Sequence, residues 1–276
     1  DMSVNFSNTF NDVHFTCDYI SLCANVIKII LLLPLCTYVL YLGYRQWRQQ
    51  HSFQSHSDLY TFHLAAMELF WIFGFFCLIC NKCPVISIVG NCAIRVAFYG
   101  EIFFHDLTCV ERYLAVVHPV IYHGLKSTRG LRIKIISIGG VWLLSFGLTF
   151  INLGICSAYS SFPLLCLLII SILATSFCSF YALCALIRPK PGLEKGERVD
   201  RSKRRALHTI IFLWCMLCLW FVMLLLKFIL GQSSLYSYIG QCLVSTVLNW
   251  FNLCSCLVLP LMFLRRTGKL SSIFNN

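Results

Sequence analysis

Seven long apolar stretches restrict the fold of this chain more than any other feature. A helix needs about 20 apolar residues to cross the hydrocarbon core of a bilayer. The stretches cover about residues 22–44, 58–80, 85–113, 131–153, 164–187, 206–230 and 236–264. Only 12% of the residues are charged, whereas a soluble domain carries about 25%. The sequence therefore predicts an all-α membrane protein with seven transmembrane helices.

The third stretch is unusual because it contains several charged or titratable residues. They are Arg95, Glu101, His105 and Asp106. Such side chains are costly in lipid, so they face the interior of a helix bundle or a water-filled cavity. We therefore expect the third helix in the middle of the bundle.

The distribution of basic residues predicts the orientation in the membrane. Most of the 22 lysine and arginine residues lie between stretches one and two, three and four, five and six, and after stretch seven. Positively charged loops face the cytoplasm. This assigns residues 1–21 to an extracellular N-terminus, 22–264 to the transmembrane domain and 265–276 to a cytoplasmic tail. The net charge of +11 is then explained by loops beside anionic lipid, without a nucleic-acid partner.

A charged triplet, Glu111-Arg112-Tyr113, stands at the end of the third stretch. An apolar run that ends at Pro119 follows it, and then a basic segment. This order resembles the signature of rhodopsin-like (class A) G-protein-coupled receptors. The resemblance implies a seven-helix bundle with a short amphipathic eighth helix from Arg265. It also implies an extracellular ligand and a heterotrimeric G protein, with Glu111 holding Arg112 at rest.

Other landmarks of that family are present only in part. Glu68 stands at the aspartate position of the second-helix motif, and Trp142 matches the tryptophan of the fourth helix. His63 is similar to the branch of protease-activated, nucleotide and lipid receptors. The sixth and seventh helices depart from the family, which has a tryptophan, a proline, an asparagine and a tyrosine where this chain has Met216, Cys218, Leu259 and Phe263. These departures favour an atypical or decoy receptor with weak coupling as the alternative.

Two glutamates, Glu68 and Glu101, fall near the middles of the second and third stretches. In the family, the matching positions help to line a small sodium-binding pocket. Two carboxylates at this depth cannot both ionise cheaply. We therefore expect either a shared proton or a cation between them. The alternative is one protonated glutamate that is hydrogen-bonded to a neighbouring helix.

Two cations are candidates for a ligand site, with Arg95 in the outer third of the third stretch and Lys227 near the outer end of the sixth. In the family, these depths face the ligand cavity, and two converging cations would favour a small anionic ligand. Snorkelling of the long side chain to the membrane surface explains Lys227 equally well.

Covalent modifications are expected on the extracellular side. In the family, a cysteine at the top of the third helix bonds to the second outer loop. Cys83 is the candidate here, with Cys156 or Cys166 as its partner, and the sequence does not choose between them. Asn5 begins a sequon for N-glycosylation.

We therefore expect a plasma-membrane receptor that binds an extracellular ligand, activates a G protein and performs no chemistry of its own. A transporter or channel is the alternative from another class, because acids in the middle of membrane helices also suit an ion pathway. Against it, the sequence has no internal repeat of the kind that many transporters show.

Overall fold

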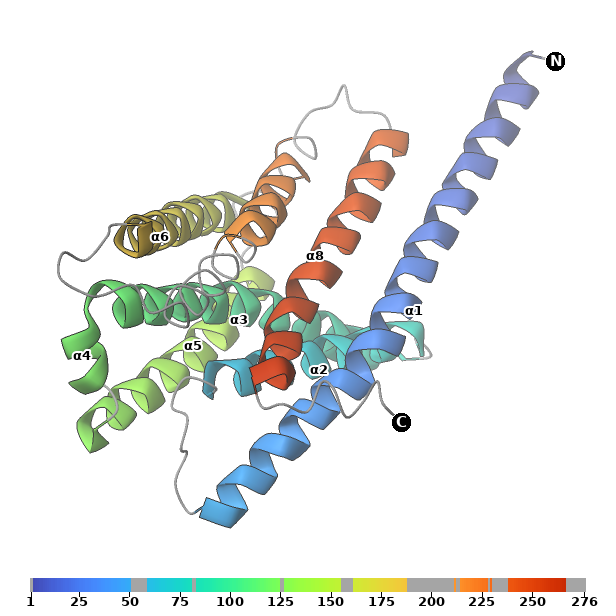
Figure 1. The fold of residues 1–276 in the computed structure, drawn as a ribbon. Helices are drawn as coiled ribbons and strands as arrows, with labels where there is room; N and C mark the ends of the chain where they lie inside the picture. The colour runs from blue at the N-terminus through green and yellow to red at the C-terminus, as the bar shows by residue number, and fades with distance from the viewer. Residues whose placement is uncertain are drawn as a thin grey trace.

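The computed structural model describes residues 2–50, 59–80, 83–124, 127–154, 161–187, 211, 214–227, 229 and 238–266. Apart from short turns, these residues are helical (Figure 1). The labelled helices are α1 (Met2–Gln50), α2 (Leu59–Ile79), α3 (Pro84–Val117), α4 (Pro119–Gly124), α5 (Thr128–Gly154), α6 (Ser161–Ile187) and α8 (Tyr238–Arg266). A shorter apolar helix, Trp214–Lys227, lies between α6 and α8 in the chain.

Within the described residues, six helices are long and apolar enough to cross a membrane. Their apolar segments are Tyr19–Gln46, Leu59–Ile79, Pro84–Val117, Arg129–Leu153, Leu164–Ala185 and Val244–Arg265. They coincide with the first five predicted stretches and with the seventh. In the predicted sixth stretch, the described apolar helix is Trp214–Lys227, and residues 206–210 lie outside the described part of the chain. The chain is therefore a helical, multi-pass membrane protein.

The outward faces of these helices carry large apolar side chains. Ile30, Phe73, Ile136, Leu143 and Leu173 are all more than half exposed, and they come from α1, α2, α5 and α6. Exposure of so much apolar surface to water is unfavourable. These faces are therefore suited to contact with lipid.

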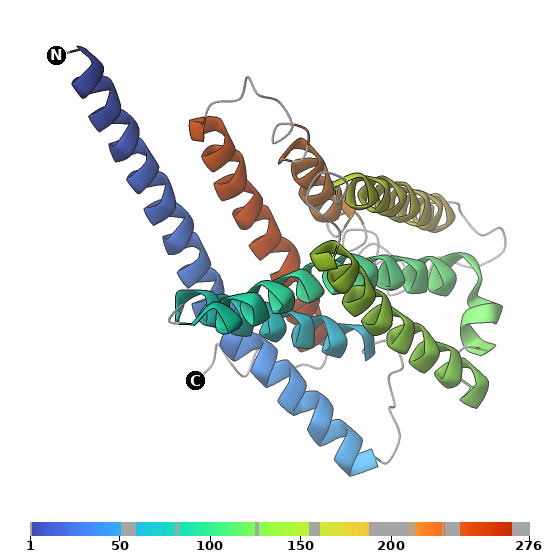
Figure 2. The same cartoon turned by 180° about the vertical axis from the view of Figure 1, so that it is seen from behind.

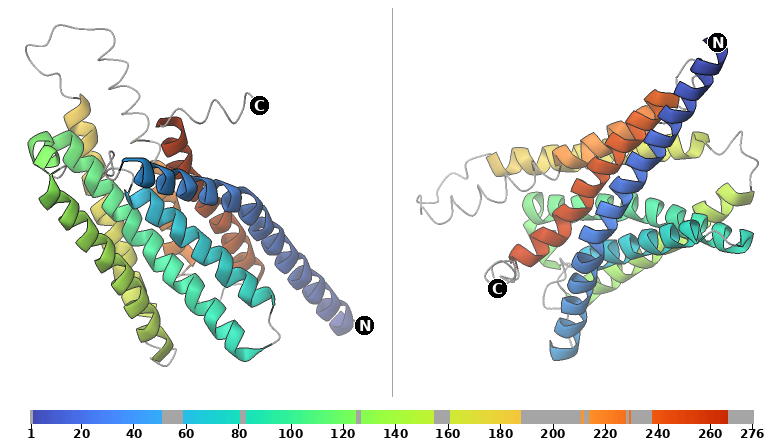
Figure 3. Two further views of the ribbon diagram at one scale, coloured as in Figure 1. Left: turned by 90° about the horizontal axis from the view of Figure 1, so that it is seen from below. Right: turned by 90° about the vertical axis from the view of Figure 1, so that its right-hand side faces the viewer.

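Helix α3 lies in the middle of the assembly, as its polar residues predicted. It contacts α2, α4, α5 and α6, and α1 packs against both α2 and α8. Viewed from below, α5, α3, α2 and α1 follow one another across the molecule (Figure 3, left). The view from behind shows α8 alongside α1 (Figure 2).

Helices α2 and α3 approach each other closely. Gly74 and Gly90 face each other there, so that a Cβ atom added to Gly74 would lie 2.7 Å from the carbonyl oxygen of Gly90. Small residues allow the backbones of membrane helices to pack closely. This packing places Glu68 of α2 and Glu101 of α3 on neighbouring helices in a fixed register.

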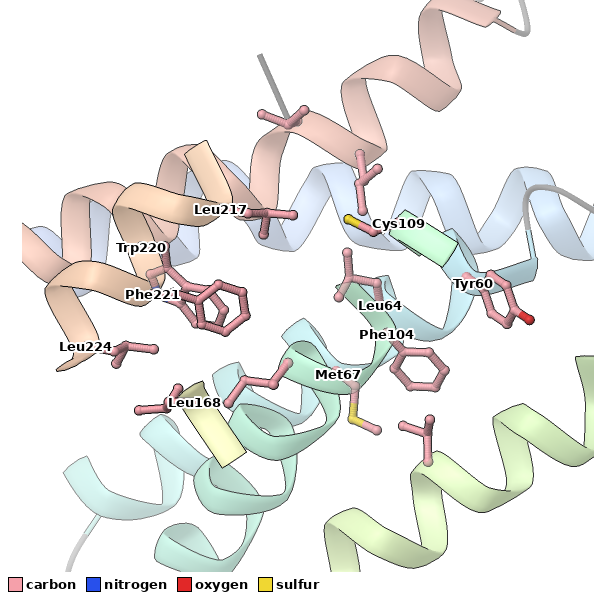
Figure 4. Close-up of a cluster of buried hydrophobic side chains, with 14 of the residues drawn as sticks. Tyr60, Leu64, Met67, Phe104, Cys109, Leu168, Leu217, Trp220, Phe221 and Leu224 are labelled. Atoms are coloured by element: carbon pink, nitrogen blue, oxygen red, sulfur yellow. The ribbon is translucent and has the colours of Figure 1, made fainter. Parts of the chain in front are cut away.

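A second layer of packing joins α2 and α3 to α5, α6, Trp214–Lys227 and α8. Figure 4 shows this cluster, in which Trp220 and Phe221 of Trp214–Lys227 lie with Leu168 of α6, Met67 of α2 and Phe104 of α3. All five side chains are almost completely buried. Because Trp220 and Phe221 are large, the cluster fixes Trp214–Lys227 against α3 and α6.

Helix α1 is longer than the predicted span, because it begins at Met2 and not near residue 22. The sequence has no glycine or proline before Pro34, so nothing breaks the helix on this side of the apolar segment. Residues 2–21, which were assigned to the extracellular N-terminus, therefore form the first turns of the same helix.

Candidate functional site

A cluster of polar side chains joins four helices in the centre of the structure. Lys28 comes from α1, Glu68 from α2, Glu101 from α3, and Asn252 and Cys256 from α8. Lys28 Nζ lies 3.4 Å from Glu68 Oε2 and donates a hydrogen bond to Asn252 Oδ1 at 2.5 Å. The amide nitrogen of Asn252 donates to Glu101 Oε2 at 3.4 Å. A chain of polar contacts thus runs from α2 through α1 and α8 to α3.

The structure brings Glu68 and Glu101 together, as the sequence predicted. They are 1% and 2% exposed, and one carboxylate oxygen of each, together with Cys256 Sγ, falls within a group of atoms less than 4.8 Å apart. Burial of two carboxylates so close together is costly unless a positive charge or a proton compensates them. The structure supplies a positive charge from within the chain.

That charge is Lys28, which the sequence analysis did not include in the site. Lys28 is 4% exposed, and its ammonium group lies 4.0 Å from the centre of the Trp71 ring. An ionisable residue inside an apolar span is a functional candidate by default. Lys28 lies well within the apolar segment Tyr19–Gln46, and this signal was present in the sequence.

A cavity of about 560 Å³ opens above this cluster. Arg95 and Lys227, the two predicted ligand-binding cations, both line it. Its walls also include the apolar side chains of Phe98, Ile94, Leu164, Leu168, Trp220, Leu224 and Leu248. Lys28, Glu101 and Asn252 belong to the same lining, so the cavity connects the two cations to the buried cluster.

The upper part of the cavity is held in place by a hydrogen bond between α3 and α5. Asn152, which lines the cavity, donates to the hydroxyl oxygen of Tyr99 at 2.7 Å. Arg95 and Lys227 are both exposed there. Exposed cations at the mouth and apolar side chains in the walls suit a ligand with an anionic group and an apolar body.

A second pair of polar residues lies further along α3, namely the buried His105 and the half-buried Asp106. Asp106 Oδ2 accepts a hydrogen bond from Ser171 of α6 at 2.7 Å. His105 packs edge-to-face against Trp220, with 5.9 Å between the ring centres. These contacts use the remaining polar residues of the third predicted stretch to join α3 to α6 and to Trp214–Lys227.

At the far end of α3, the buried Glu111 has a partner that the sequence did not indicate. Lys134 of α5 donates to Glu111 Oε1 at 2.5 Å. This ion pair joins two helices. The contact of Glu111 with the adjacent Arg112, which the resemblance implied, stays a prediction. Arg112 is half-buried. Tyr113, the third residue of the triplet, lies 3.3 Å from His118 Nε2 through its hydroxyl oxygen.

The two landmarks His63 and Trp142 contact each other. Trp142 Nε1 donates to His63 Nδ1 at 3.3 Å, and the His63 ring stacks on Phe104 of α3. The pair joins α2 to α5 beside α3. Both residues therefore have a structural role that their separate positions in the sequence did not reveal.

The predicted modifications find no support in the described residues. Cys83 and Cys166 are free, so the disulfide expected at Cys83 is not formed in the structure. Cys166 lies inside the apolar segment Leu164–Ala185 and not in an outer loop. Cys156, the side chain of Asn5 and residues 267–276 of the predicted eighth helix lie outside the described part.

No protein-family model matches this chain, and no curated protein sequence matches it significantly.

Proposed function

We propose that this chain is a seven-helix receptor of the rhodopsin-like class, in the plasma membrane with its N-terminus outside. In this proposal Trp214–Lys227 is the sixth membrane helix, since the apolar sequence continues upstream to Ala206. The receptor binds a small anionic ligand in the cavity and activates a heterotrimeric G protein at the opposite end of α3.

The observation that supports the proposal is that the ligand cavity and the proposed G-protein contact lie along the same helix, α3. Arg95 lines the cavity at one end, and Glu111-Arg112-Tyr113 stands about four and a half turns further along the same helix. A rigid helix that touches both a ligand cavity and a partner surface can communicate between them. The basic residues near the second end, which include Arg129 and Arg132, support its assignment to the cytoplasmic side.

The coupling proposal predicts the effect of one arginine. Arg112→Ala is expected to lower nucleotide exchange on a G protein by roughly 10–100-fold, the range for loss of one charge-assisted contact. The measurement is GTP-analogue binding by purified G protein mixed with the receptor in nanodiscs. Arg48→Ala, at the exposed end of α1, is the matched control and should behave as wild type. Equal exchange with Arg112→Ala and wild type contradicts coupling through this residue.

The ligand proposal is tested separately with a panel of anionic probes, namely nucleotides, fatty acids and dicarboxylates. A probe that raises the melting temperature should bind roughly 10–100-fold more weakly to Arg95→Gln, because a charge-assisted hydrogen bond contributes about 1.5–3 kcal/mol. Lys227→Gln should weaken the same probe, and Arg48→Gln should not. A panel in which neutral analogues bind equally well argues against an anion site.

A transporter is the second candidate, because Lys28, Glu68 and Glu101 form a buried charged network below an open cavity. Such networks also occur in proton and ion pathways. Proton or solute flux into proteoliposomes measures this directly. Flux that is abolished by Glu101→Gln, without any nucleotide exchange on G proteins, favours the transporter. A ligand-binding protein with neither activity fits the decoy receptor.

A further inference from the structure

The buried cluster contains three formal charges, and their arrangement limits what else can bind there. Glu68 and Glu101 contribute two negative charges and Lys28 one positive charge, so the cluster carries one excess negative charge when all three are ionised. One proton on the carboxylate pair removes this excess. With Lys28 in place, the cluster therefore reaches neutrality without an ion from solution.

The position of the Lys28 ammonium group determines which oxygens are left for a metal cation. It lies 3.4 Å from Glu68 Oε2 and 2.5 Å from Asn252 Oδ1, and Trp71 covers it from another side. These two oxygens are donors that a metal cation between the helices would need. The ammonium group of Lys28 thus stands where the family resemblance implies a sodium ion, with its positive charge beside two of the oxygens that would bind that ion.

Further possible ligand atoms lie close to this ammonium group. Oxygen atoms of Glu68 and Glu101 and the sulfur of Cys256 lie within 4.8 Å of one another. Glu68 Oε1 and Glu101 Oε1 are buried and have no hydrogen-bond partner in the described structure. If the Lys28 ammonium group were removed, these oxygens and Asn252 Oδ1 would surround the space that it had filled. The two carboxylates would then have no positive charge beside them.

We propose that Lys28 is a built-in counter-ion that makes this protein independent of sodium, and that its removal converts the cluster into a sodium site. Glu68, Glu101 and Asn252 supply the oxygen ligands of that site. Lys28, Glu101 and Asn252 line the open cavity, which gives an ion from solution a route to the cluster. Snorkelling does not explain this lysine, because its side chain is buried against Trp71 and points toward Glu68.

Thermal unfolding of the purified protein in nanodiscs tests the proposal. Melting temperatures are compared in sodium chloride and in choline chloride of equal ionic strength. Wild type should melt at the same temperature in both salts. Lys28→Met should melt about 5–10 °C lower in choline, because it leaves buried carboxylates without their counter-ion. Sodium should then raise its melting temperature in a saturable manner.

Two control variants separate the charge from other effects of substitution. Lys28→Arg keeps a cation at the site and should stay independent of sodium. Lys227→Met removes another lysine from the same cavity, but one that lies outside the carboxylate cluster, and it should not create a sodium response. A saturable sodium response in wild type, or none in folded Lys28→Met, overturns the proposal.

Removal of one carboxylate provides a test if Lys28→Met alone does not fold. Lys28→Met/Glu68→Gln should fold, or melt above Lys28→Met in choline, because it buries one ionisable carboxylate fewer. Lys28→Met/Glu101→Gln should lose the sodium response, and Glu68→Gln and Glu101→Gln should give non-additive shifts when combined. Double variants that are only as stable as the sum of the single changes would overturn the inference. Neither ligand nor G protein enters these measurements, so the result is independent of the proposed receptor function.

Discussion

Lys134→Met is expected to destabilise the protein by up to about 3–5 kcal/mol, because it removes the ammonium group that pairs with the buried Glu111. Methionine keeps the length and the apolar contacts of the side chain, so the change acts chiefly on the charge. The Lys134 ammonium group also lies 5.6 Å from the centre of the Tyr60 ring. One side chain of α5 thus contacts both α2 and α3.

Unfolding in nanodiscs with increasing denaturant measures this effect. Arg132→Met is the matched control, because Arg132 is an exposed cation on the same helix and its replacement should change stability by less than about 0.5 kcal/mol. Lys134→Met/Glu111→Gln should recover most of the loss, since the pair is then neutral. An equal loss in the single and double variants would show that Lys134 acts through packing and not through its charge.

The membrane helices could be predicted from the sequence because each depends on local composition alone. The predicted stretch 85–113 corresponds to α3, which extends from Pro84 to Val117. Pro84 is at the first helical position, where the absence of an N–H group costs nothing, and Cys83 before it is extended. The predicted stretch 22–44 starts where the apolar residues start, whereas α1 begins at Met2, so the N-terminal part of the helix was not predicted.

The partners of the charged residues could not be predicted in the same way. Burial of Glu68, Glu101 and His105 followed from their position in apolar segments. The pairing of Glu68 with Lys28, and of Glu111 with Lys134, depends on how α1 and α5 are rotated about their axes. That rotation is set by side-chain packing between distant segments, for which a single sequence gives no direct signal.

The cavity illustrates the same distinction. The depths of Arg95 and Lys227 follow from counting along each helix, and the resemblance implied that residues at these depths face a ligand cavity. The connection of this cavity to Lys28 and Asn252 was not expected, because it requires α1 and α8 to approach α3 from one side. The structure thus adds Lys28 and Asn252 to a cavity for which the sequence had indicated only Arg95 and Lys227.

The crossing of α2 and α3 gives the second large expected effect, in which Gly74→Ala destabilises the protein by about 1–3 kcal/mol through overpacking. A Cβ atom at Gly74 would lie 2.7 Å from the carbonyl oxygen of Gly90 and 3.0 Å from the backbone nitrogen of Ile94. Backbone atoms cannot rotate away as a side chain can, so α2 and α3 must separate. Because Glu68 and Glu101 lie on these two helices, the separation should also weaken the central cluster.

Gly139→Ala is the matched control for this change. Gly139 is exposed on α5, and an added Cβ atom meets no other atom within 4 Å. Alanine is favoured over glycine inside a helix, so this variant should be as stable as wild type or more stable by up to about 1 kcal/mol. The two variants are compared by thermal unfolding and by the yield of monodisperse protein. If both substitutions prove equally harmless, α2 and α3 are not in close contact at Gly74, and the register that brings Glu68 to Glu101 must have another cause.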